Sequence, residues 1–305
     1  MTVILEQVDK WYGAHHAVQD LSFEVRQGEI FSILGPNGAG KTTTIRMILD
    51  IIKPDKGTIR VFGQSFTEKT KDRIGYLPEE RGLYRNVPLV QLLTYLGQLK
   101  GMQRQAAAQR AKDLLEKVGL EEHLKSKVKA LSRGMAQKVQ FVATILHQPE
   151  LIIIDEPFSG LDPVNTQLIK DMLFEMRDQG TTIMMSTHQM HQVETMADRM
   201  LMISQGKRVL YGPVDEVRQQ YAQNAVIVEG QGDWAALEGV GSIESQRNGE
   251  VLLHLAQDVT PDQIMSRLAT LPNYHIRRFE LAIPGLDEIF IQVAQNGGEA
   301  NHAQP

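Results

Sequence analysis

Cysteine is absent from this 305-residue sequence. Its absence excludes disulfide bonds and thiolate metal sites, and it is compatible with a reducing compartment such as the cytosol. A long apolar run is absent as well, because the strongest candidate, residues 151–154, ends at Asp155. A transmembrane helix needs roughly 18 or more consecutive apolar residues, so we expect no membrane span in this chain.

The first six residues lack the basic segment and the long apolar segment of a secretion signal. We therefore expect no signal peptide. If the chain serves transport, the path through the membrane is expected to belong to a different chain.

Basic residues are not in excess: 32 Lys and Arg stand against 37 Asp and Glu, which gives a formal net charge of -5. A balance of this kind argues against general nucleic-acid binding, which usually needs a basic face. With 42% hydrophobic and 23% charged residues, the composition is that of a globular protein. The length allows one large domain or two ordinary ones.

Apolar spacing along the first two thirds of the chain predicts strands that alternate with helices. The expected strands are 3–8, 21–25, 29–34, 58–62, 151–154 and 182–186, and the expected helices include 42–49 and 167–177. This alternation is typical of an α/β fold with a mostly parallel sheet. Between 87 and 148 the apolar residues recur at three- and four-residue steps, which predicts helices. We therefore expect a domain over 1–220 with a helical subdomain at about 85–150.

The composition changes near residues 219–224, where glutamine becomes frequent. Beyond this point, short strands and two helices are expected over 225–295, and we interpret them as a small α+β domain. A segment of this size can hold its own core. Residues 296–305 are polar, and we expect them to form a disordered tail.

The pattern G-x-x-x-x-G-K-[ST] is present as Gly35, Pro36, Asn37, Gly38, Ala39, Gly40, Lys41 and Thr42. It follows a predicted strand and precedes a predicted helix, which is the context of a phosphate-binding loop. Glycines let backbone N–H groups converge on phosphate oxygens, and the following helix directs its positive end there. We expect Lys41 to bridge the β- and γ-phosphates, Thr42 to bind Mg²⁺ and Thr43 to bind the α-phosphate. The alternative is a glycine-rich turn that binds nothing.

A second motif, residues 131–140, reads Leu-Ser-Arg-Gly-Met-Ala-Gln-Lys-Val-Gln and precedes an apolar run that ends in Asp-Glu. Together with the phosphate-binding loop, it strongly resembles the ATP-binding cassette (ABC) ATPases over about residues 3–218. The resemblance implies a P-loop NTPase fold of ABC type and ATP as the nucleotide. In that family the motif is the signature, and its Ser132 and Gly134 contact ATP held by another subunit. The chain carries one such set of motifs, which implies one half of a homodimer or of a heterodimer with a second ABC subunit.

The resemblance assigns roles to further side chains. Asp155 is expected to bind Mg²⁺, mostly through water, and Glu156 to polarise the attacking water. Asp162, in a Ser-Gly-Leu-Asp segment, matches the loop that crosses the dimer interface, and His188 matches the histidine that contacts the γ-phosphate. Lys41, Glu156 and His188 are therefore the expected catalytic residues. The alternatives are solvated acids at a strand end and a histidine with a structural role.

An aromatic residue marks the adenine end of the expected site. Tyr12 stands where the family places an aromatic ring against adenine. Trp11 offers a similar flat surface, but the position favours Tyr12 and leaves Trp11 to packing. His191, three residues after His188, is expected to be an exposed helix residue.

Two motifs depart from the commonest family pattern. Glu79 stands where most members have a glutamine that reaches Mg²⁺ and senses the permease. A glutamate is also a hard oxygen ligand, and it brings a charge, so we expect Glu79 to bind the metal. Arg133 and Met135 replace glycine and glutamine in the signature, and Arg133 adds a cation close to a polyphosphate. The alternative is a degenerate, inactive site, against which the retained Glu156, His188 and Asp162 argue.

These departures resemble a subgroup of the family. Residues 76–84, Tyr-Leu-Pro-Glu-Glu-Arg-Gly-Leu-Tyr, and the basic signature resemble the ATPases of sodium-extruding exporters (NatA type). Residues 284–290 resemble the end of a small C-terminal domain common in ABC type 2 export ATPases. We therefore expect an ATP-hydrolysing subunit at the cytoplasmic face of the plasma membrane, which powers export by a separate integral membrane permease. The permease is expected to bind in a groove beside Glu79 and residues 87–99.

Other functions compete with this interpretation. DNA-repair members of the family insert long coiled coils, for which the segment between Lys41 and Asp155 is too short, and translation factors carry two cassettes. A P-loop kinase or switch GTPase would lack the signature. We therefore expect no nucleic-acid partner. Sodium is one candidate cargo beside small organic compounds, lipids and peptides, because cargo contacts lie in the permease.

Overall fold

A computed structural model describes residues 1–79, 82–245 and 250–295 of the chain. The expected disordered tail lies outside these residues, and so do residues 80–81 of the segment that resembles the sodium exporters. The chain divides into two compact units, Met1–Val214 and Asp215–Pro305. In the described ranges, no helix is both long enough and apolar enough to cross a membrane.

The first unit is built on two sheets. One has six strands in the order β5-β6-β7-β3-β8-β9, and the other has three strands in the order β2-β1-β4. All neighbours in the six-stranded sheet are parallel except β8 and β9, whereas the three-stranded sheet is antiparallel. The strands are β1 (Val3–Tyr12), β2 (His15–Val25), β3 (Ile30–Leu34), β4 (Lys56–Val61), β5 (Ile74–Leu77), β6 (Leu151–Asp155), β7 (Thr182–Thr187), β8 (Arg199–Ser204) and β9 (Lys207–Pro213).

The six-stranded sheet is buried on both faces, which explains the unbroken apolar run in β6. Ile152 and Ile154 pack into a core formed with the helices, while Leu151 and Ile153 pack into a second core formed with the three-stranded sheet. Successive side chains of a strand point to opposite faces, so a strand between two cores must be apolar at every position. The helices of this unit are α1 (Lys41–Ile48), α2 (Glu68–Asp72), α3 (Leu89–Leu99), α4 (Arg104–Lys117), α5 (Arg133–Ile145), α6 (Pro163–Asp178) and α7 (Met190–Met196), with short 3₁₀ turns η1 (Glu121–His123) and η2 (Val128–Ala130).

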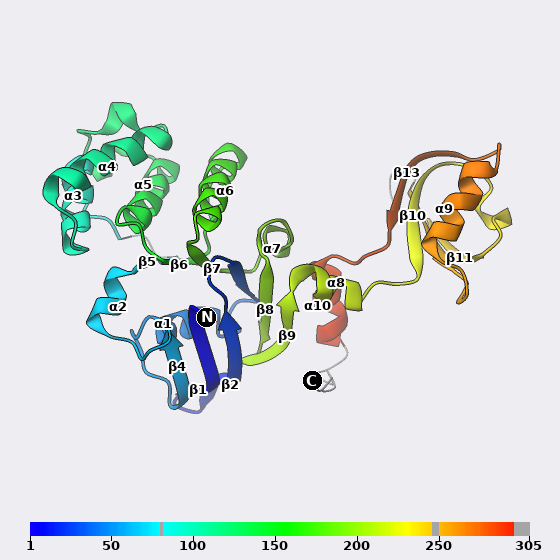
Figure 1. Ribbon diagram of the computed structural model, residues 1–305, viewed down its shortest axis with the longest axis horizontal. Helices are drawn as coiled ribbons and strands as arrows, with labels where there is room; N and C mark the ends of the chain where they lie inside the picture. The colour runs from blue at the N-terminus through cyan, green and yellow to red at the C-terminus, as the bar shows by residue number, and fades with distance from the viewer. Residues whose placement is uncertain (80–81, 246–249, 296–305) are drawn as a thin grey trace. The chain divides into compact units, whose positions relative to one another are not determined.

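Helices α3, α4 and α5 gather at one end of the first unit (Figure 1). The spacing that predicted helices between 87 and 148 is confirmed, because Leu89, Leu92 and Leu93 of α3 are all at most 1% exposed. Ala111 and Leu115 of α4 are equally buried in the same core. Strand β5 stands at the edge of the six-stranded sheet, and α5 packs against it.

The second unit contains a four-stranded antiparallel sheet in the order β11-β12-β10-β13. Helix α9 begins with a capping box between Thr260 and Gln263, and it buries Ile264 and Leu268 in the core of this sheet. The elements are α8 (Val214–Gln220), β10 (Ala225–Gln231), η3 (Trp234–Ala236), β11 (Val240–Ser245), β12 (Glu250–Leu255), α9 (Pro261–Thr270), β13 (His275–Leu281) and α10 (Leu286–Gln295). The strands and helix α9 contribute to one small core, which makes this unit an α+β fold.

Candidate active site

The loop between β3 and α1 contains two glycines that no other residue could replace. Gly35 has φ of 152°, and a Cβ atom there would lie 2.1 Å from the carbonyl oxygen of Ile203. Gly40 has φ of 108°, and its Cβ would lie 2.6 Å from the carbonyl oxygen of Ala17. Both conformations and both contacts require glycine. Gly35 and Gly40 therefore let the loop lie close to neighbouring backbone. Residues 36–38, in the middle of the loop, are exposed.

Lys41 begins helix α1 and folds back over the loop. Its Nζ donates to the carbonyl oxygens of Gly35 at 2.7 Å and Pro36 at 3.2 Å. Burial lowers the pKa of the Lys41 ammonium, and the negative charges of Glu156 and Asp155 oppose this change. The helix begins at the same point, so its unpaired N–H groups and the ammonium face the same space.

Asp155 ends strand β6 and is almost fully buried. Its Oδ2 accepts a hydrogen bond from the Thr42 hydroxyl at 3.0 Å, and its Oδ1 accepts one from the Ser186 hydroxyl. A hydroxyl beside a carboxylate, with Glu79 lining the same cleft, is a set of hard oxygen donors that suits Mg²⁺. Ser186 was not predicted as a site residue, although it is paired in register with Asp155 at the end of the neighbouring strand.

Glu156 is held in place by the last residue of β7 and by the residue that follows it. Its Oε1 accepts a hydrogen bond from the backbone N–H of His188 at 3.1 Å and lies 2.7 Å from His188 Nδ1, and its Oε2 accepts one from the Thr187 hydroxyl at 3.3 Å. The backbone of Glu156 is left-handed, with φ of 54°, which turns the chain sharply after the strand. The carboxyl ends of β6 and β7 lie side by side, so the two loops bring an acid and a histidine together.

Most of the predicted site residues line one cleft of about 440 Å³. Its lining includes Tyr12, Asn37, Gly38, Ala39, Gly40, Lys41, Thr42, Thr43, Glu79, Asp155, Glu156 and His188, and also His15 and Ala17. Tyr12 is 48% exposed, whereas the Trp11 ring stacks on the His16 ring with a centroid distance of 4.0 Å. The structure thus places Tyr12 rather than Trp11 at the cleft.

Gly35 and Pro36 belong to the loop that forms this cleft but are not among its lining residues, and three further predicted residues lie on other elements. Ser132 caps the start of α5, where its Oγ accepts from the Met135 N–H at 3.3 Å, and Gly134 lies in the first turn of the same helix. Asp162 caps the start of α6 through a 2.9 Å hydrogen bond from the Asn165 N–H, which holds the pKa of this exposed carboxyl below its usual value. None of the three is among the described residues that line the cleft.

Comparison with known proteins identifies the family. A family model described as ABC transporter matches residues 18–159, and one described as ATP-binding protein DrrA1-3-like, C-terminal domain, matches residues 212–294. An uncharacterized ABC transporter ATP-binding protein of Bacillus subtilis, YhaQ, is 36% identical over 291 residues, which cover 94% of this chain and 97% of YhaQ. The chain belongs to the ABC transporter ATP-binding proteins.

Further comparisons narrow the class within this family. The linearmycin resistance ATP-binding protein LnrL of Bacillus subtilis is 33% identical to the chain, and the match covers 94% of the chain and 96% of LnrL. A solved structure of an ATP-binding subunit of an ABC transporter is 31% identical, with a TM-score of 0.68, over 72% of this chain and 93% of that one. The predicted ABC fold and ATPase activity are thus confirmed. The chain, called the ABC protein below, is an ATP-binding subunit of the exporter class with a DrrA-like C-terminal domain.

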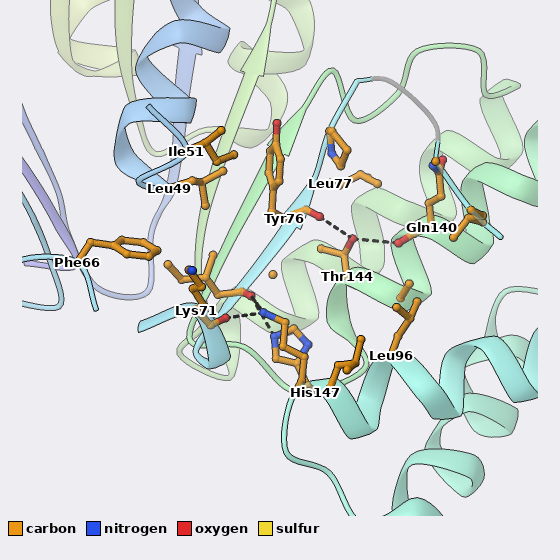
Figure 2. A pocket seen from close by; sticks show the side chains of 18 residues that line it. Leu49, Ile51, Phe66, Lys71, Tyr76, Leu77, Leu96, Gln140, Thr144 and His147 are labelled. Carbon is orange, nitrogen blue, oxygen red and sulfur yellow. Dashed lines mark hydrogen bonds between the residues drawn. The ribbon is translucent and has the colours of Figure 1, made fainter. Parts of the chain in front are cut away.

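A larger cavity, of about 550 Å³, lies beside β5 in the ABC protein (Figure 2). Its lining is mainly apolar and includes Leu49, Ile51, Phe66, Leu77, Leu83, Leu96 and Leu99. Because β5 is an edge strand, its outer carbonyls are available to side chains. The carbonyl oxygen of Ile74 accepts from Lys100 Nζ at 3.2 Å and lies 3.1 Å from His147 Nε2. Two residues after β5 ends, the chain reaches Glu79 in the nucleotide cleft, so the cavity and the cleft share this strand.

His147 makes the stability of the ABC protein sensitive to acid. Burial, with the positive charge of Lys100, lowers the pKa of His147 from 6.5 to about 4. Well above pH 6.5 the imidazole is neutral in both the folded and the unfolded state. As the pH falls from 6.5 towards 4, the unfolded chain binds a proton that the folded chain does not, so the free energy of unfolding decreases.

We expect His147→Gln to reduce this acid sensitivity, because the amide can still donate to Ile74 and does not titrate. Between pH 7 and pH 5 the variant should lose about 1 kcal/mol less stability than the wild type, a value discounted for partial solvent screening. Urea unfolding at the two pH values measures the difference. His191→Gln, at an exposed helix position, is the matched control, and an equal loss in the wild type and His147→Gln would contradict the prediction.

Proposed function

We propose that this chain is the ATP-hydrolysing subunit of an exporter, in which two ABC subunits close around ATP and thereby move a separate membrane permease. The observation that carries the proposal is the convergence of Lys41, Thr42, Asp155, Glu156 and His188 on one cleft. A phosphate-binding loop alone would bind a nucleotide. Glu156, which is held in place by Thr187 and His188, adds a carboxylate that can accept a proton from water.

The residues of the chain suit each part of this chemistry. The loop N–H groups and the Lys41 ammonium would bind the β- and γ-phosphates. Glu156 would accept the proton of the attacking water, since its hydrogen bonds from Thr187 and His188 fix the carboxylate in place. Thr42, Asp155 and Glu79 would hold Mg²⁺, which supplies charge neutralisation between the phosphates.

The remaining motif residues require a second subunit. Ser132, Gly134 and Asp162 stand at the starts of α5 and α6 and do not line the cleft of their own chain. A second cassette that faces this one, identical or closely related, would bring such groups to the ATP. The proposal therefore includes a homodimer or heterodimer, closed by ATP and reopened by hydrolysis.

The permease is proposed to bind at the cavity beside β5, on the cytoplasmic face of the plasma membrane. The cavity lies against α3 and against Leu77 and Pro78, which precede Glu79. Its mainly apolar lining suits a short helix of the permease, which would insert apolar side chains. Movement of β5 would then connect the permease to the nucleotide cleft.

Purification from native membranes tests the proposed partner. We expect the full-length chain, tagged at its C-terminus and solubilised in mild detergent, to bring down an integral membrane protein in a defined ratio. Leu96→Glu, which places a charge in the cavity, should reduce recovery of that protein at least about fivefold while ATP binding is retained. Recovery of no membrane protein by a correctly folded chain would favour the alternative, a soluble ABC protein.

We propose two candidate cargoes, sodium and an organic antibiotic. Residues 76–79, with the basic signature, support sodium, as in the exporters that these motifs resemble. The name of LnrL supports an organic antibiotic instead. Growth of a strain that lacks the gene, in high sodium and in linearmycin, distinguishes the two, since export protects only against the compound exported.

A further inference from the structure

Residues 11–16 hold two aromatic rings and two imidazoles around a two-residue connection. The order is Trp11, Tyr12, Gly13, Ala14, His15 and His16, and the connection joins β1 to β2. In the strand register, Trp11 is paired with His16, and Tyr12 with His15. Each aromatic ring therefore has an imidazole directly across from it.

In the first of these pairs, the Trp11 and His16 rings already pack against each other. The Trp11 and His16 rings stack with a centroid distance of 4.0 Å and an interplanar angle of 14°. His16 Nε2 also lies 2.6 Å from Asp9 Oδ1, and the Lys56 ammonium lies 5.3 Å from the Trp11 ring centroid. These contacts fix both rings and leave no free ring face for a ligand between them.

The other pair faces the nucleotide cleft. Successive residues of a strand point to opposite sides, so Tyr12 and His15 lie on the side opposite Trp11 and His16. Both are exposed, and both line the cleft that contains the phosphate-binding loop. Within the described part of the chain, no hydrogen bond to the His15 ring is found, so its nitrogens are available to a ligand.

We propose that His15 contacts the edge of the nucleobase that stacks on Tyr12, and so contributes to the choice of nucleotide. This proposal rests on the proposed function, since it requires a nucleoside phosphate in the cleft. Directly paired residues have Cβ atoms about 4.5–5.5 Å apart, which is too close for a base to insert between their rings with a full van der Waals distance on each side. The base therefore stacks on Tyr12 alone, and a His15 nitrogen forms a hydrogen bond with a nitrogen at the base edge.

Binding of MgADP and of magnesium pyrophosphate to the full chain separates base contacts from phosphate contacts, and neither ligand is consumed during the measurement. Calorimetric titration should show that His15→Ala raises the Kd for ADP about fivefold, which corresponds to the loss of one hydrogen bond. The Kd for pyrophosphate should stay within twofold of the wild-type value. His15→Asn, which keeps a donor and an acceptor, should restore at least half of the lost affinity on a logarithmic scale. His191→Ala, on the exposed face of α7, should change neither constant.

Three results would overturn the assignment of His15. An ADP Kd within twofold of wild type in His15→Ala excludes the contact, and an equal loss of pyrophosphate affinity shows a phosphate contact instead. Rescue by Phe but not by Asn shows stacking rather than an edge hydrogen bond. The proposed function fails in a different way, through a wild-type chain that binds neither ligand.

Discussion

Glu156→Gln is expected to lower the rate of ATP hydrolysis by at least about 100-fold, because an amide cannot accept a proton from the attacking water. The substitution leaves the surroundings intact. The amide oxygen can still accept from the His188 N–H, and the amide nitrogen can donate to the Thr187 hydroxyl that now faces Oε2. The left-handed backbone, with φ of 54°, is the same for both side chains.

The same variant should accumulate as an ATP-bound dimer. Lys41 and the loop glycines are unchanged, so ATP still binds, and closure is not followed by hydrolysis. Phosphate release at saturating MgATP measures the first effect, and size-exclusion chromatography with and without MgATP measures the second. Glu122→Gln, at an exposed position in η1, is the matched control. Hydrolysis within threefold of wild type in Glu156→Gln would remove the assigned role of this carboxylate.

Much of the cleft could be predicted from sequence because its residues follow one another along the chain or follow predicted strands. Gly35 to Gly40 lie between a strand and a helix that begins at Lys41, and Asp155 and Glu156 follow a four-residue apolar run. The carboxyl ends of neighbouring parallel strands meet at one edge, so residues after β6 and β7 come together. Local patterns therefore carry most of the information.

The parts that were not predicted depend on contacts between distant residues. Strand β8 begins with the buried Arg199, whose Nη1 lies 3.3 Å from Glu29 Oε1, a partner 170 positions away. A charged residue at a strand start gives no sign of burial until its partner is known. Ser186 was missed for a similar reason: only the register of β7 with β6 brings it to Asp155.

Gly134→Asp is expected to abolish hydrolysis without loss of ATP binding to the phosphate-binding loop. A Cβ at Gly134 meets no atom within 4 Å, and an acid in the first turn of α5 is favourable to the helix, so the variant should fold. In the closed dimer, its carboxylate would face the triphosphate held by the second subunit. Repulsion there should lower the hydrolysis rate at least about 100-fold, measured by phosphate release. Gly134→Ala, with the same backbone change and no charge, should keep most of the activity.

Mixing two inactive variants decides whether the signature acts on its own nucleotide or on that of its partner. Lys41→Ala lacks the ammonium at the phosphates but keeps its signature, and Gly134→Asp has the reverse defect. A mixed dimer then contains one site with an intact loop from one subunit and an intact signature from the other. Random pairing makes about half of the dimers mixed, so recovery of up to about a quarter of wild-type hydrolysis is expected. If each signature acted within its own chain, both subunits would stay defective, and the mixture would be no more active than its components.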